Sequence, residues 1–326
     1  MGLWHVNADT LAGSRFLVSA LAETTACLLS LHTRQAGHPG ERAWLDTHQG
    51  AYRAHLAADP VTAALTRAAV RGHWIADFIT PTPTGVHEPS FDAEISQVRA
   101  MSADAARQDL RVALRGPLPA VLDRADLPER AADLLTWVWR NTVLPDWERR
   151  RRIIEADIVG RSGQLGQGGW AAVLDSMRPG MRWLGGSRLQ VNPRDYPPLE
   201  VSGTRLFFVP VTHGQAWVCW ATDPPPDRYA VVHPCSGVLA DVDRTAVPKA
   251  LQRLIGPGRA GVLVLLDAPK STTHLVALTG QGLGSVGRHL RILLDAGLVG
   301  RRRSGRSVLY HRTAAGEALV KAPGTG

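Results

Sequence analysis

The residues whose types and spacing best suit a chemical task are arginines near the C-terminus. Arg301, Arg302 and Arg303 are consecutive, and Arg306 follows after a Ser-Gly pair. Guanidinium groups bind phosphate oxygens and the O6 and N7 edge of guanine. The chemistry that this cluster predicts is therefore the neutralisation of a polyanion such as nucleic acid.

A helix with further polar side chains is predicted directly before these arginines. The segment SVGRHLRILLDAGLV, residues 285–299, has apolar residues three and four positions apart. Its apolar stripe consists of Val286, Leu290, Leu293 and Leu294. The side chains expected on the outer face or its rim are Ser285, Arg288, His289, Arg291 and Asp295. Such a face can enter a major groove while the arginine-rich hairpin reaches the adjacent backbone or the minor groove.

The charge of the chain is concentrated in the same region. From residue 259 onward, ten Lys or Arg residues stand against three acidic residues, a net charge of +7. The whole chain of 326 residues has a net charge of +8, so residues 1–258 carry only +1. A basic C-terminal module joined to a charge-balanced body is typical of proteins that bind a phosphate backbone.

Composition limits the remaining possibilities. The length allows two or three domains, and 44% hydrophobic with 20% charged residues is typical of a globular protein. No window approaches the roughly 18 uninterrupted apolar residues of a membrane span, and no secretory signal is visible, so a cytoplasmic protein without membrane contact is expected. Three scattered cysteines, Cys27, Cys219 and Cys235, predict buried reduced thiols rather than a disulfide framework.

The elements that must position the arginines follow from periodicity. Residues 10–80 and 91–160 have helical spacing, and Pro and Gly between 80 and 90 predict a loop. The run from Arg149 to Arg152 lies among acidic residues and is interpreted as a solvated helix face.

After a helix at 168–177, short runs rich in β-branched and aromatic residues predict antiparallel strands. The expected fold class is α+β, with a mostly helical N-terminal region, a small antiparallel β region and a C-terminal basic module. The expected domains are a helical domain at 1–160, an α/β sub-domain at 161–245 and the basic module at 246–326.

The basic module itself has a specific order of elements. Three helices, RAGVLVLLD, TTHLVALTG and SVGRHLRILLDAG, are followed by two strands around Ser304-Gly305. Ser271 or Thr272 is placed to cap the second helix, and Gly297 to end the third with a left-handed residue.

These segments resemble the winged helix-turn-helix of the ArsR family of bacterial repressors. The resemblance lies in LVALTG at 275–280, SVGRHL at 285–290, AGLV at 296–299 and RSGRSVLY at 303–310, and it covers residues 256–322. It implies a homodimer that binds a partly palindromic operator in double-stranded DNA and changes its grip when an effector binds. The candidate DNA-binding residues are Ser271, Thr272, Ser285, Arg288, His289, Arg291, Arg301, Arg302, Arg303 and Arg306. For His289 a capping or packing role is the alternative, and Tyr310 is expected in the hairpin core.

Departures from the family pattern shift the expected contacts. Gly282, Leu283, Gly284 and Gly287 stand where family members often have polar residues, so base readout is expected to depend more on Arg288 and the hairpin. The family's metal sensors carry paired Cys on the second helix, which has none here, and His274 stands alone. No metal and no cofactor are therefore expected.

The 250 residues before the module resemble the N-terminal region of long actinobacterial regulators of this type. A neutral body with ten Trp residues is large enough to enclose a pocket, so it is expected to sense a small organic effector or to set dimer geometry. The candidate ligand-binding residues are Trp137, Trp170, Trp217 and Trp220.

Three alternatives stay open at this point. In the first, the protein binds DNA constitutively and its body binds another protein. In the second, the body is an enzyme with Cys219 or Cys235 as nucleophile and His213 as base, although no further catalytic motif accompanies them, so no enzyme is expected. In the third, Cys219 and Cys235 form a redox switch.

Overall fold

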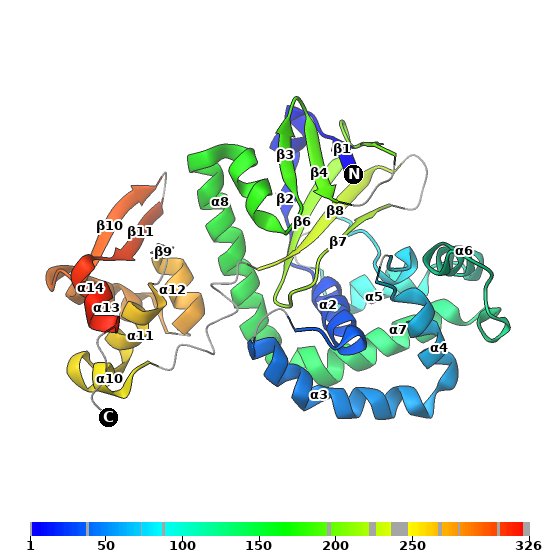
Figure 1. Ribbon diagram of the computed structural model, residues 1–326, viewed down its shortest axis with the longest axis horizontal. Coiled ribbons are helices and arrows are strands. Elements are labelled where there is room, and N and C mark those ends of the chain that lie inside the picture. The colour runs from blue at the N-terminus through cyan, green and yellow to red at the C-terminus, as the bar shows by residue number, and fades with distance from the viewer. Residues whose placement is uncertain are drawn as a thin grey trace. The chain divides into compact units, whose positions relative to one another are not determined.

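The computed structural model has a mixed α/β fold, about 59% helical with small sheets (Figure 1). It describes residues 2–36, 39–72, 74–86, 89–193, 197–221, 226–235, 247–266, 269–279, 281–304 and 307–321. Among these residues, no helix combines the length and apolar character that crossing a bilayer requires. Contacts divide the chain into unit 1, Met1–Arg150 with Met177–Pro234, and unit 2, Arg151–Ser176 with Cys235–Gly326.

The helices of unit 1 confirm the two predicted helical regions. They are α1 (Ala8–Gly13), α2 (Ala20–Thr33), α3 (Pro39–Ala58), α4 (Pro60–Ala69), α5 (Phe91–Arg99), α6 (Ala103–Leu114) and α7 (Leu127–Val138). Short turns of other helix types cover Asp77–Ile79, Ala120–Leu122, Trp139–Val143 and Leu144–Asp146. Helix α8 (Trp147–Met177) begins in unit 1 and continues into unit 2, with a non-helical Gly169 at φ +66°. The described residues of the predicted loop at 80–90 contain neither helix nor strand.

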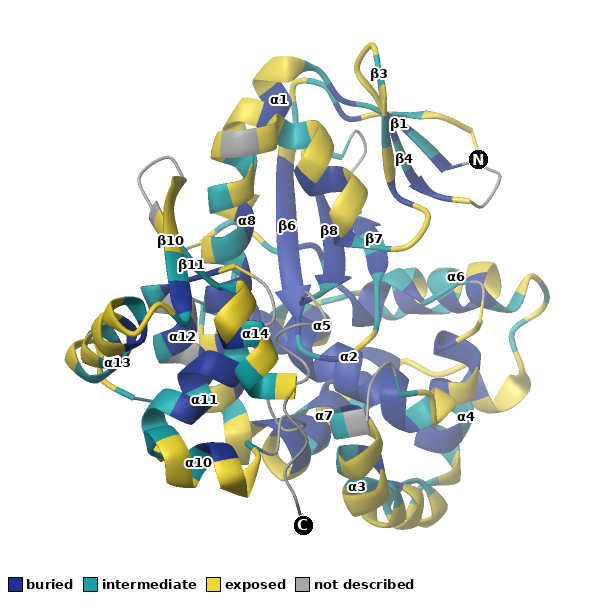
Figure 2. Cartoon of the chain, turned by 60° about the vertical axis from the view of Figure 1, so that its left-hand side comes forward, coloured by how far each residue is buried: buried dark blue, intermediate teal, exposed yellow. Residues whose placement is uncertain are grey.

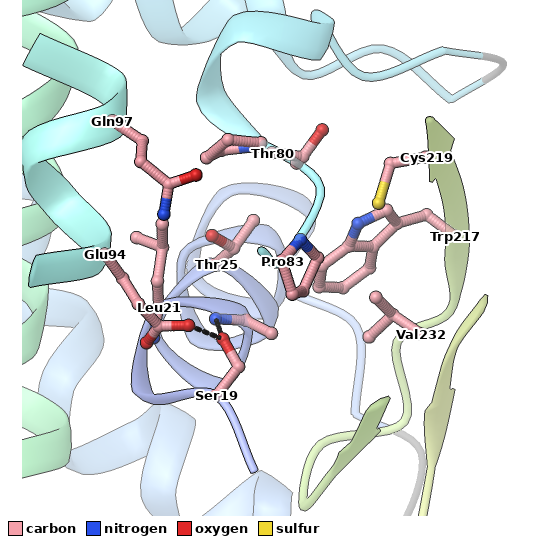
Figure 3. Close-up of a pocket in the computed structure, with 12 residues that line it drawn as sticks. Ser19, Leu21, Thr25, Thr80, Pro83, Glu94, Gln97, Trp217, Cys219 and Val232 are labelled. Atoms are coloured by element: carbon pink, nitrogen blue, oxygen red, sulfur yellow. Dashed lines mark hydrogen bonds between the residues drawn. The ribbon is translucent and has the colours of Figure 1, made fainter. Parts of the chain in front are cut away.

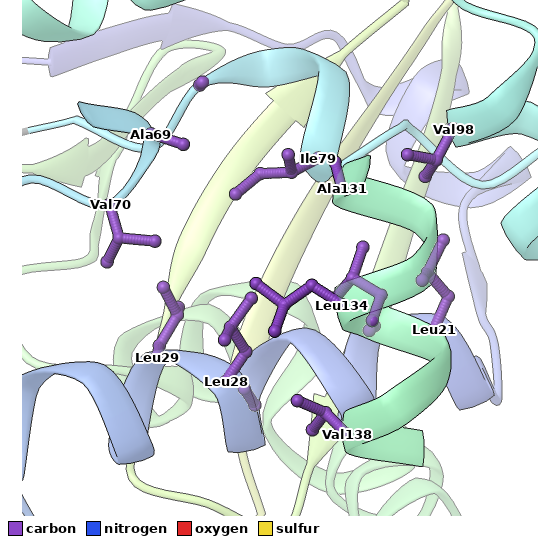
Figure 4. Packing of buried hydrophobic residues seen from close by; sticks show 14 of the residues in the cluster. Leu21, Leu28, Leu29, Ala69, Val70, Ile79, Val98, Ala131, Leu134 and Val138 are labelled. Atoms are coloured by element: carbon purple, nitrogen blue, oxygen red, sulfur yellow. The ribbon is translucent and has the colours of Figure 1, made fainter. Parts of the chain in front are cut away.

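Helix α2 is the centre of the unit 1 core because it is buried on every side. All twelve residues from Ala20 to Leu31 are buried, as expected for a helix without a polar stripe. Leu21 and Leu28 of α2 lie beside Leu134 and Val138 of α7 in the packed cluster (Figure 4). The Ser19 hydroxyl accepts from the amide of Ala22 at 2.9 Å and caps the helix start.

Two four-stranded sheets complete unit 1. The first has the order β3-β4-β1-β5, from β3 (Arg182–Gly185), β4 (Arg188–Asn192), β1 (Gly2–His5) and β5 (Leu199–Glu200). The second has the order β2-β6-β8-β7, from β2 (Arg15–Phe16), β6 (Arg205–Val211), β8 (Arg228–Pro234) and β7 (Trp217–Trp220). No strand was predicted in the segment that forms β1 and β2. From residue 10 onward, this segment was predicted to be helical.

The expectation of antiparallel strands is wrong for the second sheet. β6 pairs with β8 and with β2 in parallel, and only β7 runs antiparallel to β8. The reason is burial, because β6 and β8 are buried along nearly their whole length (Figure 2). Near-continuous apolar strands are typical of sheets covered on both faces, where parallel pairing is common.

The three-part division at residues 160 and 245 does not coincide with the two contact units. Both sheets join strands before residue 17 to strands after residue 181. The segments Met1–Arg150 and Met177–Pro234 therefore share one unit.

The described part of unit 2 contains the helices and strands predicted for the basic module and adds one short strand. The elements are α10 (Lys249–Ile255), α11 (Pro257–Leu265), β9 (Lys270–Ser271), α12 (Thr272–Thr279), α13 (Leu283–Asp295), β10 (Val299–Ser304), β11 (Ser307–Arg312) and α14 (Ala314–Lys321). The segments VPKALQRLI and TAAGEALVKA, which indicate helices in the sequence, form α10 and α14, whereas β9 was not predicted. A single apolar cluster packs α11, α12 and α13 against the β10-β11 hairpin, whose sheet has the order β10-β11-β9.

The end of α13 follows the prediction closely. Gly297 has φ +68°, the left-handed conformation that glycine adopts without strain. The amide of Gly297 donates to the carbonyl of Leu294, and the amide of Leu298 donates to that of Leu293. These two bonds form a Schellman motif, which turns the chain from the helix into β10.

Candidate functional site

Helix α13 presents one apolar face and one polar face. Val286, Leu290 and Leu293 are at most 1% exposed and belong to the unit 2 core. Arg288 and Arg291 are exposed on the opposite side. The core therefore fixes the helix while leaving both guanidinium groups accessible.

The arginines of α13 and β10 form an exposed basic group. The exposed ones are Arg288, Arg291, Arg301, Arg302 and Arg303. None of them pairs with a carboxylate within the described part of the chain. Arg312 behaves differently, because its guanidinium donates to Glu317 and to the carbonyl of Val264, each at 2.9 Å. Arg312 thus stabilises the fold, whereas the exposed arginines are available to a partner.

Strand β10 lies at the edge of its sheet and presents three of these arginines. Arg301 is paired in register with Tyr310, which packs against the core of unit 2 as predicted for the hairpin core. Arg306, also a candidate, lies outside the described residues. Cationic side chains on an edge strand discourage pairing with other strands and create a positive ridge beside α13.

His289 and Ser285 contact their own module more than solvent. A methyl group on Gly258 of α11 would lie 2.5 Å from His289 Nε2, so the ring packs on that backbone. The Ser285 hydroxyl donates to Gln281 at 3.0 Å and lies 3.4 Å from His289 Nε2. Burial and the charges of Arg259 and Arg288 lower the pKa of His289. The alternative packing role of His289 matches this position.

Ser271 and Thr272 differ in accessibility. Ser271 is 8% exposed in β9, where it pairs in register with Leu309, and Thr272 is half-buried at the start of α12. Ser271 therefore offers little surface for a phosphate contact.

The four candidate tryptophans do not meet in one place. Trp217 lines a pocket in unit 1, and Trp220 contacts Trp74 edge-on with ring centroids 6.2 Å apart. Trp137 stacks on His55 at 4.4 Å. Trp170 belongs to unit 2. Only Trp217 stands at a cavity described in this structure.

The cysteines have the character of buried structural thiols. Cys27, Cys219 and Cys235 are buried thiols outside any disulfide among the described residues, as predicted. Burial raises the pKa of the Cys219 thiol to about 12, which suppresses the thiolate that a nucleophile or redox switch needs. His213, the candidate base, has its Nδ1 atom 2.8 Å from Glu41 Oε1. This nitrogen is therefore already in contact with a carboxylate.

A buried charge network lies around α2 and was missed by sequence reasoning. Arg150 Nη1 donates to Glu23 Oε1 at 2.6 Å, and the amide of Thr212 donates to Glu23 Oε2 at 2.7 Å. Burial opposes ionisation of Glu23, but Arg150, His213 and Thr212 outweigh it and lower its pKa. The solvated-face interpretation of Arg149–Arg152 is wrong for Arg150, which is 7% exposed because it must reach Glu23.

The same network contains a geometrically possible metal site. Ligand atoms of Glu23, Cys27 and His213 lie within 4.8 Å of one another. Arg150 Nη1 is 2.6 Å from Glu23 and 3.5 Å from Cys27 Sγ. This guanidinium supplies the positive charge that a metal ion would bring, so the donor set fits an ion pair better than a metal.

The pocket beside α2 has a cavity volume of about 20 Å³ and is partly open to solvent. Figure 3 shows Glu94, Gln97 and Thr25 toward one side and Pro83, Trp217 and Val232 toward the other. Glu94 Oε1 accepts from the Ser19 hydroxyl at 2.6 Å, and Oε2 accepts from the amide of Leu21 at 2.9 Å. Burial raises the pKa of Glu94 to about 7 despite these hydrogen bonds.

One sequence signal pointed to the buried network. Glu23 is the one acidic residue in the otherwise uncharged apolar run from Leu17 to Leu31. An apolar helix without a polar face is buried, so a carboxylate within it needs a partner. The identity of that partner, 127 residues away, has no local signal.

Comparison with known proteins gives no relative: no family model, no curated protein and no solved structure matches this chain.

Proposed function

We propose that this protein is a DNA-binding transcriptional regulator whose C-terminal module is a winged helix-turn-helix of the ArsR type. In this proposal α13 is the recognition helix, α11 and α12 support it, and the β10-β11 hairpin is the wing. The observation that carries the proposal is the set of exposed arginines on α13 and β10, which have no carboxylate partner among the described residues. Both elements pack on one apolar core. Such an arrangement suits a phosphate backbone with an adjacent groove.

The proposed roles differ between residues. Arg288, exposed and unpaired on α13, is the side chain assigned to a base edge, and Arg291 and the β10 arginines are assigned to phosphates. Ser271 and His289 are assigned mainly to the packing of the module, in keeping with the burial of Ser271 and the contact of His289 with Gly258. The resemblance adds a homodimer on a partly palindromic operator, and unit 1 is proposed to respond to a small organic effector.

The test is a fluorescence-anisotropy titration of the full chain with duplexes from its own promoter neighbourhood and with scrambled duplexes. Arg288→Ala should weaken binding to the preferred duplex by about 1–3 kcal/mol at fixed salt. Arg53→Ala is the matched control, because it removes an equally exposed arginine from α3 in unit 1. Binding that does not depend on salt, or an Arg288→Ala affinity equal to that of Arg53→Ala, would contradict the proposal.

A further inference from the structure

The first two turns of α13 have an exposed surface that the arginines do not account for (Figure 2). Leu283, the first residue of the helix, is 63% exposed. A spacing of four residues places Leu283, Gly287 and Arg291 in one row along the helix, and Gly284 and Arg288 in the next. The surface between the helix start and the two arginines therefore consists of one apolar side chain and bare backbone.

The glycines of this surface, Gly284 and Gly287, are not required by the packing of the described chain. A methyl group on either residue would meet no neighbouring atom within 4 Å, and neither residue has the positive φ that favours glycine. Glycine is also a much poorer helix former than alanine. Close approach of another molecule to the backbone is a reason for glycine at such positions.

The charges beside this surface indicate what kind of molecule approaches it. Arg288 and Arg291 are exposed on the same face and have no carboxylate partner among the described residues. A polyanion that also offers an apolar group satisfies both the arginines and Leu283. On the base edges of the major groove, that apolar group is the C5-methyl of thymine. Recognition helices contact base edges through their N-terminal residues, which is where Leu283 lies.

We propose that Leu283 is a specificity-determining residue that contacts a thymine methyl group, and that Gly284 and Gly287 let the helix backbone approach the bases closely. This inference rests on the proposed function and adds a base preference to it. Guanidinium groups favour phosphates and guanine, whereas an apolar side chain favours thymine. The preferred duplex should therefore have a thymine at the position that faces the first turn of α13.

Deoxyuridine lacks only the methyl group of thymidine, so it isolates this contact. Fluorescence anisotropy at fixed salt compares the preferred duplex with the same duplex in which deoxyuridine replaces every thymidine. The unaltered protein should bind the deoxyuridine duplex at least about fourfold more weakly, the factor expected for one buried methyl group. Equal affinity for the two duplexes would overturn the proposal.

Two leucine variants assign the effect to one side chain. Leu283→Ala should bind both duplexes equally, and α13 should still form because alanine is a good helix former. Leu254→Ala is the matched control, because Leu254 is 67% exposed on α10 of the same unit. This control should keep the preference for the thymidine duplex. A preference that survives in Leu283→Ala, or that disappears in Leu254→Ala, would overturn the assignment.

A glycine variant tests the close approach. Gly284→Ala should not lower the melting temperature of the protein, because the added methyl meets no neighbouring atom. Its duplex affinity should nevertheless fall about tenfold, because the methyl group holds the helix away from the bases. Gly261→Ala, at a glycine of α11 with equally open surroundings, should leave duplex affinity unchanged. Equal affinities for the two glycine variants would overturn the role of Gly284.

The same titrations separate this inference from the proposed function. Salt-dependent duplex binding with equal affinity for the thymidine and deoxyuridine duplexes would overturn the leucine contact and leave the DNA-binding proposal standing. Absence of salt-dependent binding to every duplex would overturn the DNA-binding proposal, and the leucine contact with it.

Discussion

Removing Arg150 should destabilise unit 1 more than removing any exposed arginine. In Arg150→Met the side chain keeps its apolar stem but loses the guanidinium that donates to Glu23, whose side chain is 0% exposed. At the 2.6 Å between Arg150 Nη1 and Glu23 Oε1, Coulomb attraction is about 6 kcal/mol at an effective dielectric constant of about 20. Desolvation cancels part of this attraction, and the amide of Thr212 continues to donate to Glu23.

The net expected loss is about 3–5 kcal/mol, the usual cost of leaving one buried charge unpaired. This is a large part of the roughly 5–15 kcal/mol that stabilises a domain. In the double variant Glu23→Gln with Arg150→Met, no charge is left unpaired, so the double variant should be more stable than Arg150→Met alone. The loss should also shrink as the pH falls toward 4.5, the ordinary pKa of a glutamate, because the unpaired carboxylate then takes up a proton.

Urea unfolding followed by tryptophan fluorescence measures this loss, because nine of the ten tryptophans lie in unit 1. Arg149→Met, an exposed neighbour on the same helix, is the control and should change the free energy of unfolding by less than about 0.5 kcal/mol. A midpoint for Arg150→Met equal to that of the control would refute the reasoning. So would a double variant that is less stable than Arg150→Met.

Three further predictions concern other parts of the chain. The pKa of Glu94 is raised from 4.5 to about 7 by burial, so its contribution to stability is full below pH 4.5 and is lost as the pH rises through about 7. The pKa of Asp77 is raised from 3.8 to about 7 by burial and by Asp109, so Asp77 changes stability with pH in the same direction. Glu94→Gln should therefore remove only part of the decline in urea midpoint between about pH 4.5 and about pH 7.5. An unchanged decline in the variant would count against the raised pKa of Glu94. Gly316→Ala should destabilise unit 2, because the new methyl would overlap the carbonyl of Leu298, whereas Gly287→Ala, with no atom within 4 Å, should stabilise α13 by about 0.5–1 kcal/mol; calorimetric melting that ranks the two variants the other way would contradict this packing. Arg302→Ala should reduce the slope of log affinity against log salt by about one unit if this side chain contacts a phosphate, and an unchanged slope would remove it from the proposed interface.

The sequence predicted the elements of the basic module well because their signals are local. The stripe of Val286, Leu290 and Leu293 determines which face of α13 is buried, and Gly297 ends the helix. Tyr310 packs in the core as its place in the hairpin indicated. Each of these features depends on neighbours within a few turns of the chain.

The pairing of strands and the buried charges could not be predicted in the same way. β6 and β8 have the continuous apolar character of covered parallel strands, but the helices that cover them come from distant segments. Arg150 sits in a run of four arginines, and nothing local distinguishes the one that reaches Glu23. The packing of His289 against Gly258 of α11 also has no local signal in the sequence.

The pairing of β1 with β4 and of β2 with β6 has a consequence for how the protein forms during synthesis. Residues 2–5 and 15–16 leave the ribosome before their hydrogen-bonding partners at 188–192 and 207–208, which are made some 190 residues later. Closing such long loops slows folding, so the amino-terminal half must wait with an unpaired edge until the later strands emerge. A fragment ending at residue 160 should therefore aggregate, whereas one that extends through Pro234 contains every strand of both sheets.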